Sequence, residues 1–153
     1  MELFSLEWWE GSSYVVTVIG LPMAIFVYLW DQKRDRQNDE EEIFQYLSEE
    51  YAEFQKLILE NADLRLSSNT APVMDPEQNE RRRVLYDILT SLFERAYLLV
   101  YEDHMDKQTA RMWASWEDYI RYWLGKPDYR AMLPELLDGE GPDFVAYVRK
   151  LAE

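Results

Sequence analysis

The chain has 153 residues, with 16 lysines and arginines against 30 aspartates and glutamates, and its formal net charge at pH 7 is −14. This length fits a single domain, and the lack of cysteine excludes disulfide bonds, thiolate nucleophiles and cysteine-bound metal centres. The acidic balance also argues against nucleic acid as a partner, because nucleic-acid binding requires a basic face that displaces counterions from phosphates.

The N-terminal part of the chain contains an apolar segment without charged residues, 11–30, of sequence GSSYVVTVIGLPMAIFVYLW. At about 1.5 Å per helical residue, this segment covers roughly the 30 Å hydrocarbon core of a bilayer. Aromatic residues that favour the headgroup layers lie near both of its ends: Trp8, Trp9, Tyr28 and Trp30. We therefore predict one transmembrane helix over residues 11–30, with the lipid bilayer as a partner.

The charged residues around this segment predict its orientation. Lys33, Arg34 and Arg36 follow it in a charged juxtamembrane linker, residues 31–38, whereas no basic residue precedes it. By the positive-inside rule, the short N-terminus, residues 1–10, is extracytoplasmic and the C-terminal part is cytoplasmic. Acidic residues before the segment argue against a cleaved signal peptide, which begins with basic residues.

Two small residues within the segment, Gly20 and Ala24, lie four positions apart and share one face of the predicted helix. Small residues at this spacing allow a second helix to approach closely. They predict packing against another membrane subunit or against a second copy of the chain.

Residues 39–153 form the predicted acidic cytoplasmic domain, a bundle of three main helices followed by short C-terminal helices. The first helix is predicted from about Asp39 to Asn61, because apolar residues recur every three or four positions: Ile43, Leu47, Tyr51, Phe54 and Ile58. Nine acidic residues lie between Asp39 and Asp63, and only Lys56 opposes them. This acidic cluster indicates either a solvated helix face or a docking surface for a basic partner.

The second helix has a clear predicted start after a loop over residues 64–74. Asp75 is the predicted N-cap, Pro76 occupies the first helical position and Gln78 completes a capping box. Apolar residues from 84 to 100 cover a wide arc of this helix, which is typical of a central helix with several neighbours.

A basic triplet, Arg81, Arg82 and Arg83, lies on the second helix. Three consecutive helical residues fan over roughly 200° of the helix surface. The triplet therefore has two interpretations: pairing with the acids of the first helix, or binding of a phosphate-bearing ligand or lipid headgroup.

The third helix is predicted from the N-cap Asp106 to Gly125 and carries an aromatic stripe: Trp113, Trp116, Ile120 and Trp123. Buried tryptophans remove about 150–250 Å² of surface each from water, so a packed core seam is one interpretation. The other is that one or two of the rings meet a membrane, a partner protein or a flat ligand.

Two short C-terminal pieces follow the third helix. The first covers residues 129–137 and is interrupted by Pro134, and the second covers residues 142–151.

No pattern for catalysis is present in the sequence. The single histidine, His104, has Tyr101 three residues before it, so the Glu-x-x-His motif of di-iron bundles is missing. The serine elbow of hydrolases, the dinucleotide-binding glycines and the phosphate-binding loop are missing as well. We therefore expect a protein without catalytic residues, metal or cofactor, in which His104 lies at a helix end or on the surface.

The chain resembles a widespread group of uncharacterised bacterial proteins that have one N-terminal membrane helix and a small cytoplasmic helical domain. The residues that carry the resemblance lie at the end of the first predicted helix, in the second, in the third and just after the third: 57–65, Phe93, Glu94, Trp113, Trp116 and 127–130. The resemblance implies the cytoplasmic (inner) membrane of a bacterium and no specific activity.

Two functions fit these observations. The first is an anchor or accessory subunit of a membrane-associated complex, which would use Gly20 and Ala24 together with the acidic, aromatic-rich domain. The alternative is an oligomeric membrane effector in stress or phage defence that senses an anionic ligand through Arg81, Arg82 and Arg83.

Overall fold

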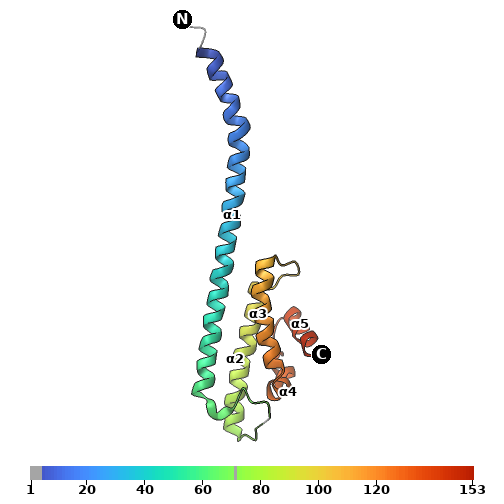
Figure 1. The fold of residues 1–153 in the computed structure, drawn as a ribbon. Helices are drawn as coiled ribbons and strands as arrows, with labels where there is room; N and C mark the ends of the chain where they lie inside the picture. The colour runs from blue at the N-terminus through green and yellow to red at the C-terminus, as the bar shows by residue number, and fades with distance from the viewer. Residues whose placement is uncertain (1–4, 71) are drawn as a thin grey trace. The chain divides into compact units, whose positions relative to one another are not determined.

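The computed structural model describes the backbone of residues 5–70 and 72–153 and the side chains of residues 23–32, 34, 38–70 and 72–153. The described residues form helices joined by loops, without a β-strand (Figure 1). The all-α class predicted from the sequence is therefore confirmed. Contacts divide the chain into two units, Met1–Glu41 and Glu42–Glu153, and each is treated by itself below.

The first helix, α1, extends over Ser5–Glu60 and belongs to both units. Its backbone stays helical through the juxtamembrane residues 31–38, so the predicted helix start near Asp39 is wrong. The preceding helix can continue through this stretch, DQKRDRQN, because it contains neither proline nor glycine, and its lysine, arginines and glutamines are good helix formers.

The first unit contains the predicted transmembrane segment, residues 11–30. Residues 11–22, with Gly20, have no described side chains, and Trp8, Trp9, Lys33 and Arg36 also fall outside the described side chains. Within the described part of the chain, no helix combines the length and the apolar character needed to span a bilayer. The transmembrane helix therefore stays a prediction.

In the second unit, the C-terminal part of α1 contributes Leu47 and Phe54 to the core. The helix ends where the Asn61 side chain donates a hydrogen bond to the Leu57 carbonyl at 2.8 Å. A short 3-10 helix, η1, follows over Ala62–Leu64. The buried side chains of Leu64 and Leu66 then fix the predicted loop to the core.

The second main helix, α2, covers Pro76–Val100 and begins as predicted. The Asp75 carboxylate accepts a hydrogen bond from the Gln78 backbone N–H at 2.8 Å, and the Asp75 backbone N–H donates to the Gln78 side chain at 3.2 Å. This capping box fixes the start of the helix. Residues of α2 from Leu85 to Val100 then line the core, in agreement with a central helix.

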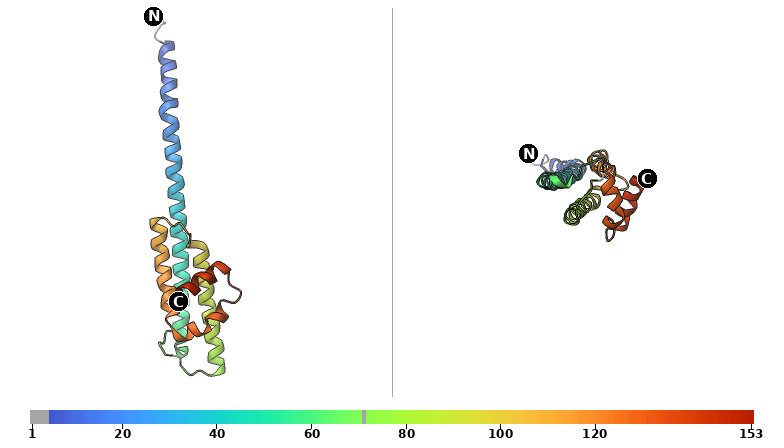
Figure 2. Two further views of the ribbon diagram at one scale, coloured as in Figure 1. Left: turned by 90° about the vertical axis from the view of Figure 1, so that its right-hand side faces the viewer. Right: turned by 90° about the horizontal axis from the view of Figure 1, so that it is seen from below.

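Three further helices complete the bundle: α3 over Lys107–Leu124, α4 over Pro127–Leu136 and α5 over Pro142–Ala152. Asp106 caps α3 through hydrogen bonds from two backbone N–H groups at 2.9 Å, as predicted. Within the second unit, α2 and α3 lie side by side, and α4 and α5 cover their flank (Figure 2).

Pro134 does not interrupt α4, contrary to the prediction. A proline removes one helical hydrogen bond, which here is the one that residue 134 would donate to the Arg130 carbonyl. The next turn still closes, because the Leu137 N–H donates to the Leu133 carbonyl at 3.0 Å. Leu133, Leu136 and Leu137 are buried and hold this turn against the bundle.

Candidate functional site

The described end of the predicted membrane segment consists of exposed apolar side chains. Their exposed fractions lie between 48% and 66%, and the residues are Met23, Ile25, Phe26, Val27, Tyr28, Leu29 and Trp30. Ala24 and Arg34 are exposed too. Leaving a run of large apolar side chains in water is unfavourable.

The arginine triplet on α2 is divided among different acceptors. Arg81 donates to Asp63 at 3.1 Å and also bonds Asn61, whereas Arg82 donates to Asp128 at 2.6 Å. Arg83 lies 3.9 Å from Glu135 of α4. Of the two interpretations, pairing with the acidic cluster that precedes α2 therefore holds for Arg81 alone, whereas Arg82 and Arg83 pair with acids of α4.

This arrangement bears on the predicted anion site. The three guanidinium groups do not meet at one point, and each has a carboxylate neighbour. An anionic ligand would have to displace those carboxylates from three separate ion pairs. The triplet is best explained as the link between α2, η1 and α4.

The tryptophan stripe of α3 forms the core seam. Trp113, Trp116 and Trp123 have exposed fractions of 3%, 0% and 0%, which confirms the first of the two interpretations. The rings make edge-to-face contacts with aromatic rings of α1 and α2, such as Phe54 with Trp123 at 5.9 Å and Phe93 with Trp116 at 6.5 Å. Buried in this way, the indoles offer almost no surface to a membrane or a partner.

Two of these indoles are held by tyrosine hydroxyl groups. The Trp123 Nε1–H donates to Tyr51 of α1 at 3.1 Å, and the Trp113 Nε1–H donates to Tyr147 of α5 at 3.0 Å. The Tyr147 hydroxyl in turn donates to Glu117 at 2.6 Å. This hydrogen bond holds the pKa of Glu117 below its usual value, with Arg121 as a further cause, whereas burial raises the pKa of Tyr147.

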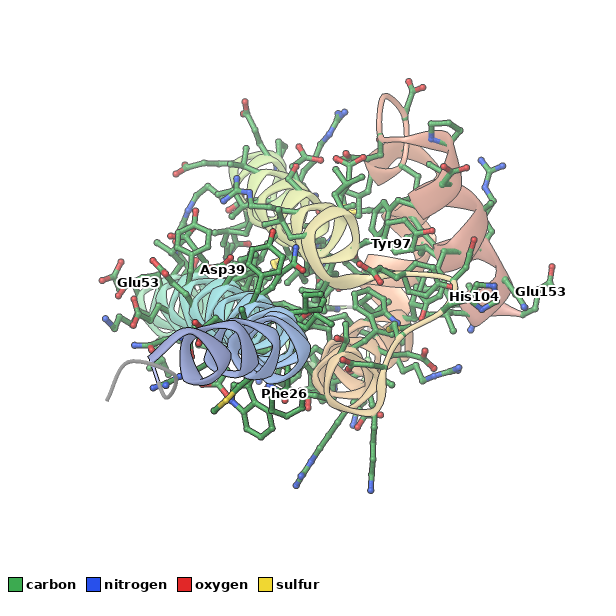
Figure 3. All side chains as sticks on the ribbon, turned by 90° about the horizontal axis from the view of Figure 1, so that it is seen from above. Phe26, Asp39, Glu53, Tyr97, His104 and Glu153 are labelled. Carbon is green, nitrogen blue, oxygen red and sulfur yellow. The ribbon has the colours of Figure 1, made fainter. Side chains whose placement is uncertain are left out.

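His104 is exposed on the connection between α2 and α3, as expected for a surface histidine (Figure 3). Among the described residues, no group of three or more acidic or histidine side chains could hold a metal ion. The part of the chain that the structure describes thus provides no metal centre near His104.

A pocket that sequence reasoning missed lies where α2 ends and α5 packs against it. Its volume is about 570 Å³. We call it the tyrosine pocket and define it by three aromatic and three charged side chains: Tyr97, Tyr101, Tyr147, Asp103, Asp143 and Lys150. Figure 3 looks at the bundle from this end and labels Tyr97 and His104.

The aromatic walls of the tyrosine pocket pack on one another. Tyr97 and Tyr101 are stacked with ring centroids 4.6 Å apart, and Tyr147 lies 5.2 Å from Tyr97 and 5.1 Å from Tyr101. Trp113 lies behind them, 5.3 Å from Tyr101. Burial raises the pKa of Tyr97, and the negative charges of Asp143 and Asp103 add to the effect.

The sequence offered a weak signal for this pocket. Tyr97 and Tyr101 are four residues apart and therefore share a helix face, but Tyr147 is some fifty residues away in the chain. Only the docking of α5 against α2 and α3 brings the three rings together, and no local pattern encodes that docking.

A pair of carboxyl groups lies where the α4–α5 connection meets α2. Glu94 accepts a hydrogen bond from the Gly141 backbone N–H at 2.5 Å, and Ser91 donates to Glu140 at 3.3 Å. Burial and the neighbouring Glu94 raise the pKa of Glu140 to about 7. The hydrogen bond from Glu140 in turn lowers the pKa of Glu94.

Comparison with protein-family models, curated proteins and solved structures gives no match. The resemblance to bacterial single-span proteins therefore stays a prediction, and the residues of this chain carry any inference about its function.

Proposed function

We propose that the chain is a non-catalytic single-pass membrane protein that serves as an anchor or accessory subunit of a membrane-associated complex. The observation that carries the proposal is the exposed apolar run from Met23 to Trp30, which continues an uncharged segment that begins at residue 11. A bilayer is the environment that covers such a segment on all sides, because lipid leaves no part of it in water.

The helical bundle supports a binding role rather than a catalytic one. Its tryptophans are used in the core, its arginine triplet is used in ion pairs and its histidine is exposed. The large excess of acidic residues instead suits a basic partner, whose approach it would accelerate by electrostatic attraction.

Membrane fractionation of the full-length chain tests the anchor. We expect the protein to stay in the membrane pellet after extraction with alkaline carbonate, which removes peripheral proteins. The variant Ile25→Asp with Val27→Asp should shift into the supernatant, because two charges within the apolar segment oppose insertion. The variant Ile25→Leu with Val27→Leu is the matched control and should stay in the pellet. A full-length chain that is recovered without detergent in the soluble fraction contradicts the proposal.

Single cysteines test the orientation, since the chain has none of its own. In spheroplasts, a membrane-impermeant thiol reagent should label Ser5→Cys directly and Ser67→Cys only after permeabilisation. The reverse labelling pattern would overturn the predicted topology.

Copurification in mild detergent tests the role as a subunit. We expect the chain to retain either a second copy or another membrane protein, and Gly20→Ile with Ala24→Ile to weaken that association by blocking close helix approach. A chain that is always monomeric and without a stable neighbour contradicts the proposed role.

A further inference from the structure

We infer that the tyrosine pocket binds an organic cation, either an alkylated ammonium or a guanidinium group. This inference does not depend on the proposed membrane anchor, because every residue of the pocket lies in the described helical bundle. It rests on three observations: the size of the pocket, its aromatic walls and its unpaired acidic residues.

The size of the pocket suits a small organic group. A volume of about 570 Å³ falls within the range of roughly 300–1,000 Å³ that is usual for ligand sites. The pocket is formed by α2, the connection that follows it, and α5, so that a ligand would contact parts of the chain that are distant in sequence.

The walls favour a cation over a neutral group. Tyr97, Tyr101 and Tyr147 are half-buried and lie within 5.2 Å of one another, centroid to centroid. The face of an aromatic ring carries partial negative charge and attracts a cation within about 6 Å of its centroid. Because the three rings pack on one another, a cation would contact the side of this cluster that faces the pocket and would not lie between the rings.

The charges strengthen this preference and disfavour anions. Asp103 and Asp143 line the pocket, and in the described part of the chain neither forms an ion pair with a lysine or arginine within 4.0 Å. Lys150 also lines the pocket, but it does not neutralise either carboxylate by direct contact. Two acids against one base leave a net negative charge at the pocket.

A bare metal ion is a poor occupant of the same site. No group of three or more metal-ligating side chains occurs among the described residues, and tyrosine ring faces do not replace the water ligands of a small, strongly hydrated ion. An alkylated ammonium or a guanidinium is weakly hydrated and carries apolar surface, so it loses little when it enters an aromatic pocket.

Titration calorimetry of the full-length chain in a maltoside detergent tests the inference, because this detergent has no cationic headgroup. The probes are tetramethylammonium chloride and arginine amide, and sodium chloride at equal ionic strength is the control. We expect saturable binding of at least one probe and none of sodium. Binding of tetramethylammonium alone points to an alkylated ammonium ligand, and binding of arginine amide alone points to the guanidinium group of a partner.

Variants locate the binding. Tyr101→Leu should weaken it by about five- to tenfold, because it removes one ring face, whereas Tyr101→Phe should preserve it. Asp103→Asn with Asp143→Asn should also weaken it without altering the rings, and Lys150→Gln should strengthen it. Tyr122→Leu, at an exposed tyrosine of α3 outside the pocket, is the matched control and should leave binding unchanged.

Circular dichroism of each variant verifies that the bundle stays folded. The inference is overturned if neither probe binds more tightly than sodium. It is equally overturned if Tyr101→Leu and the double asparagine variant, both folded, bind as well as the unmodified chain.

Discussion

Arg81 and Arg82 are adjacent in the sequence, but their ion pairs differ in burial. The Arg82 and Asp128 side chains are only 9% and 14% exposed, whereas those of Arg81 and Asp63 are 40% and 47% exposed. Removing one partner of a buried pair leaves an uncompensated charge away from water, whereas an exposed pair is screened by solvent.

We therefore expect Arg82→Ala to lower the free energy of unfolding by about 3 kcal/mol. Arg81→Ala serves as the control and should cost less than about 1 kcal/mol. Urea denaturation followed by circular dichroism measures both. Equal losses of unfolding free energy in the two variants would contradict the expectation that the buried ion pair contributes more.

Glu140 makes the stability of the bundle depend on pH. Its pKa is raised to about 7 in the folded protein, so the folded state holds its proton more tightly than the unfolded state does. The contribution of Glu140 to the free energy of unfolding is therefore fully present below its pKa in the unfolded chain, near 4.5, and is lost as the pH rises toward 7. The charges that face it, Glu94 and Asp87, both oppose its ionisation.

Glu140→Gln should abolish that loss, because glutamine stays neutral and can still donate a hydrogen bond to Glu94. We expect the variant to match the unmodified chain near pH 5 and to exceed it by on the order of 1 kcal/mol at pH 8. Thermal unfolding across this pH range measures the difference. The exposed neighbour Asp138→Asn is the control, and a Glu140→Gln curve parallel to that of the unmodified chain would exclude this explanation.

At the scale of elements, the caps that start α2 and α3 were predictable because they are local. Asp75 and Gln78 lie three residues apart, so their hydrogen bonds depend on the helix they begin and on little else. The same holds for Asp106 at the start of α3. Helix ends that depend only on neighbouring residues can be identified from the sequence alone.

The α2 cap should contribute measurably to stability. We expect Asp75→Ala to lower the free energy of unfolding by about 1 kcal/mol, because the Gln78 N–H loses its acceptor. Asp75→Asn keeps a side-chain oxygen at the same place and should be nearly neutral. A chemical denaturation midpoint that does not move in Asp75→Ala would show that the capping box is dispensable.

Other elements could not be predicted, because their outcome depends on context. The predicted helix start near Asp39 comes after a polar stretch, but a helix that has already formed continues through such a stretch when it contains no proline or glycine. Pro134 looks like a helix breaker, but the buried leucines beside it hold the turn together. In both cases information from outside the local pattern decides the structure.

At the scale of the whole molecule, the second unit contains its own core. Among the side chains that the structure describes, the buried ones all come from residues 47–148, so none of these lies in the first unit. The aromatic seam was predictable from the spacing of the α3 tryptophans, whereas its partners Tyr51, Phe54 and Phe93 were not, since periodicity identifies a face and not the face it meets.

We therefore expect residues 42–153 to fold without the first 41 residues. The fragment should show a helical spectrum and a single cooperative thermal transition. A fragment that stops at residue 140 lacks α5, with the buried Phe144 and Val148, and should lose cooperativity. A gradual, non-cooperative transition of residues 42–153 would show that the core depends on the first unit.

The interlocked rings of α3 and its neighbours have an optical consequence. Trp123 contacts Tyr86, Tyr129 and Phe54 edge-on at centroid distances of 5.9–6.2 Å, and each of these rings is itself buried. Chromophores held rigidly in such an asymmetric array give a strong near-ultraviolet dichroic signal. Loss of tight core packing would therefore remove the near-ultraviolet signal before the far-ultraviolet signal of the helices falls. The near-ultraviolet signal thus measures core packing without an added dye.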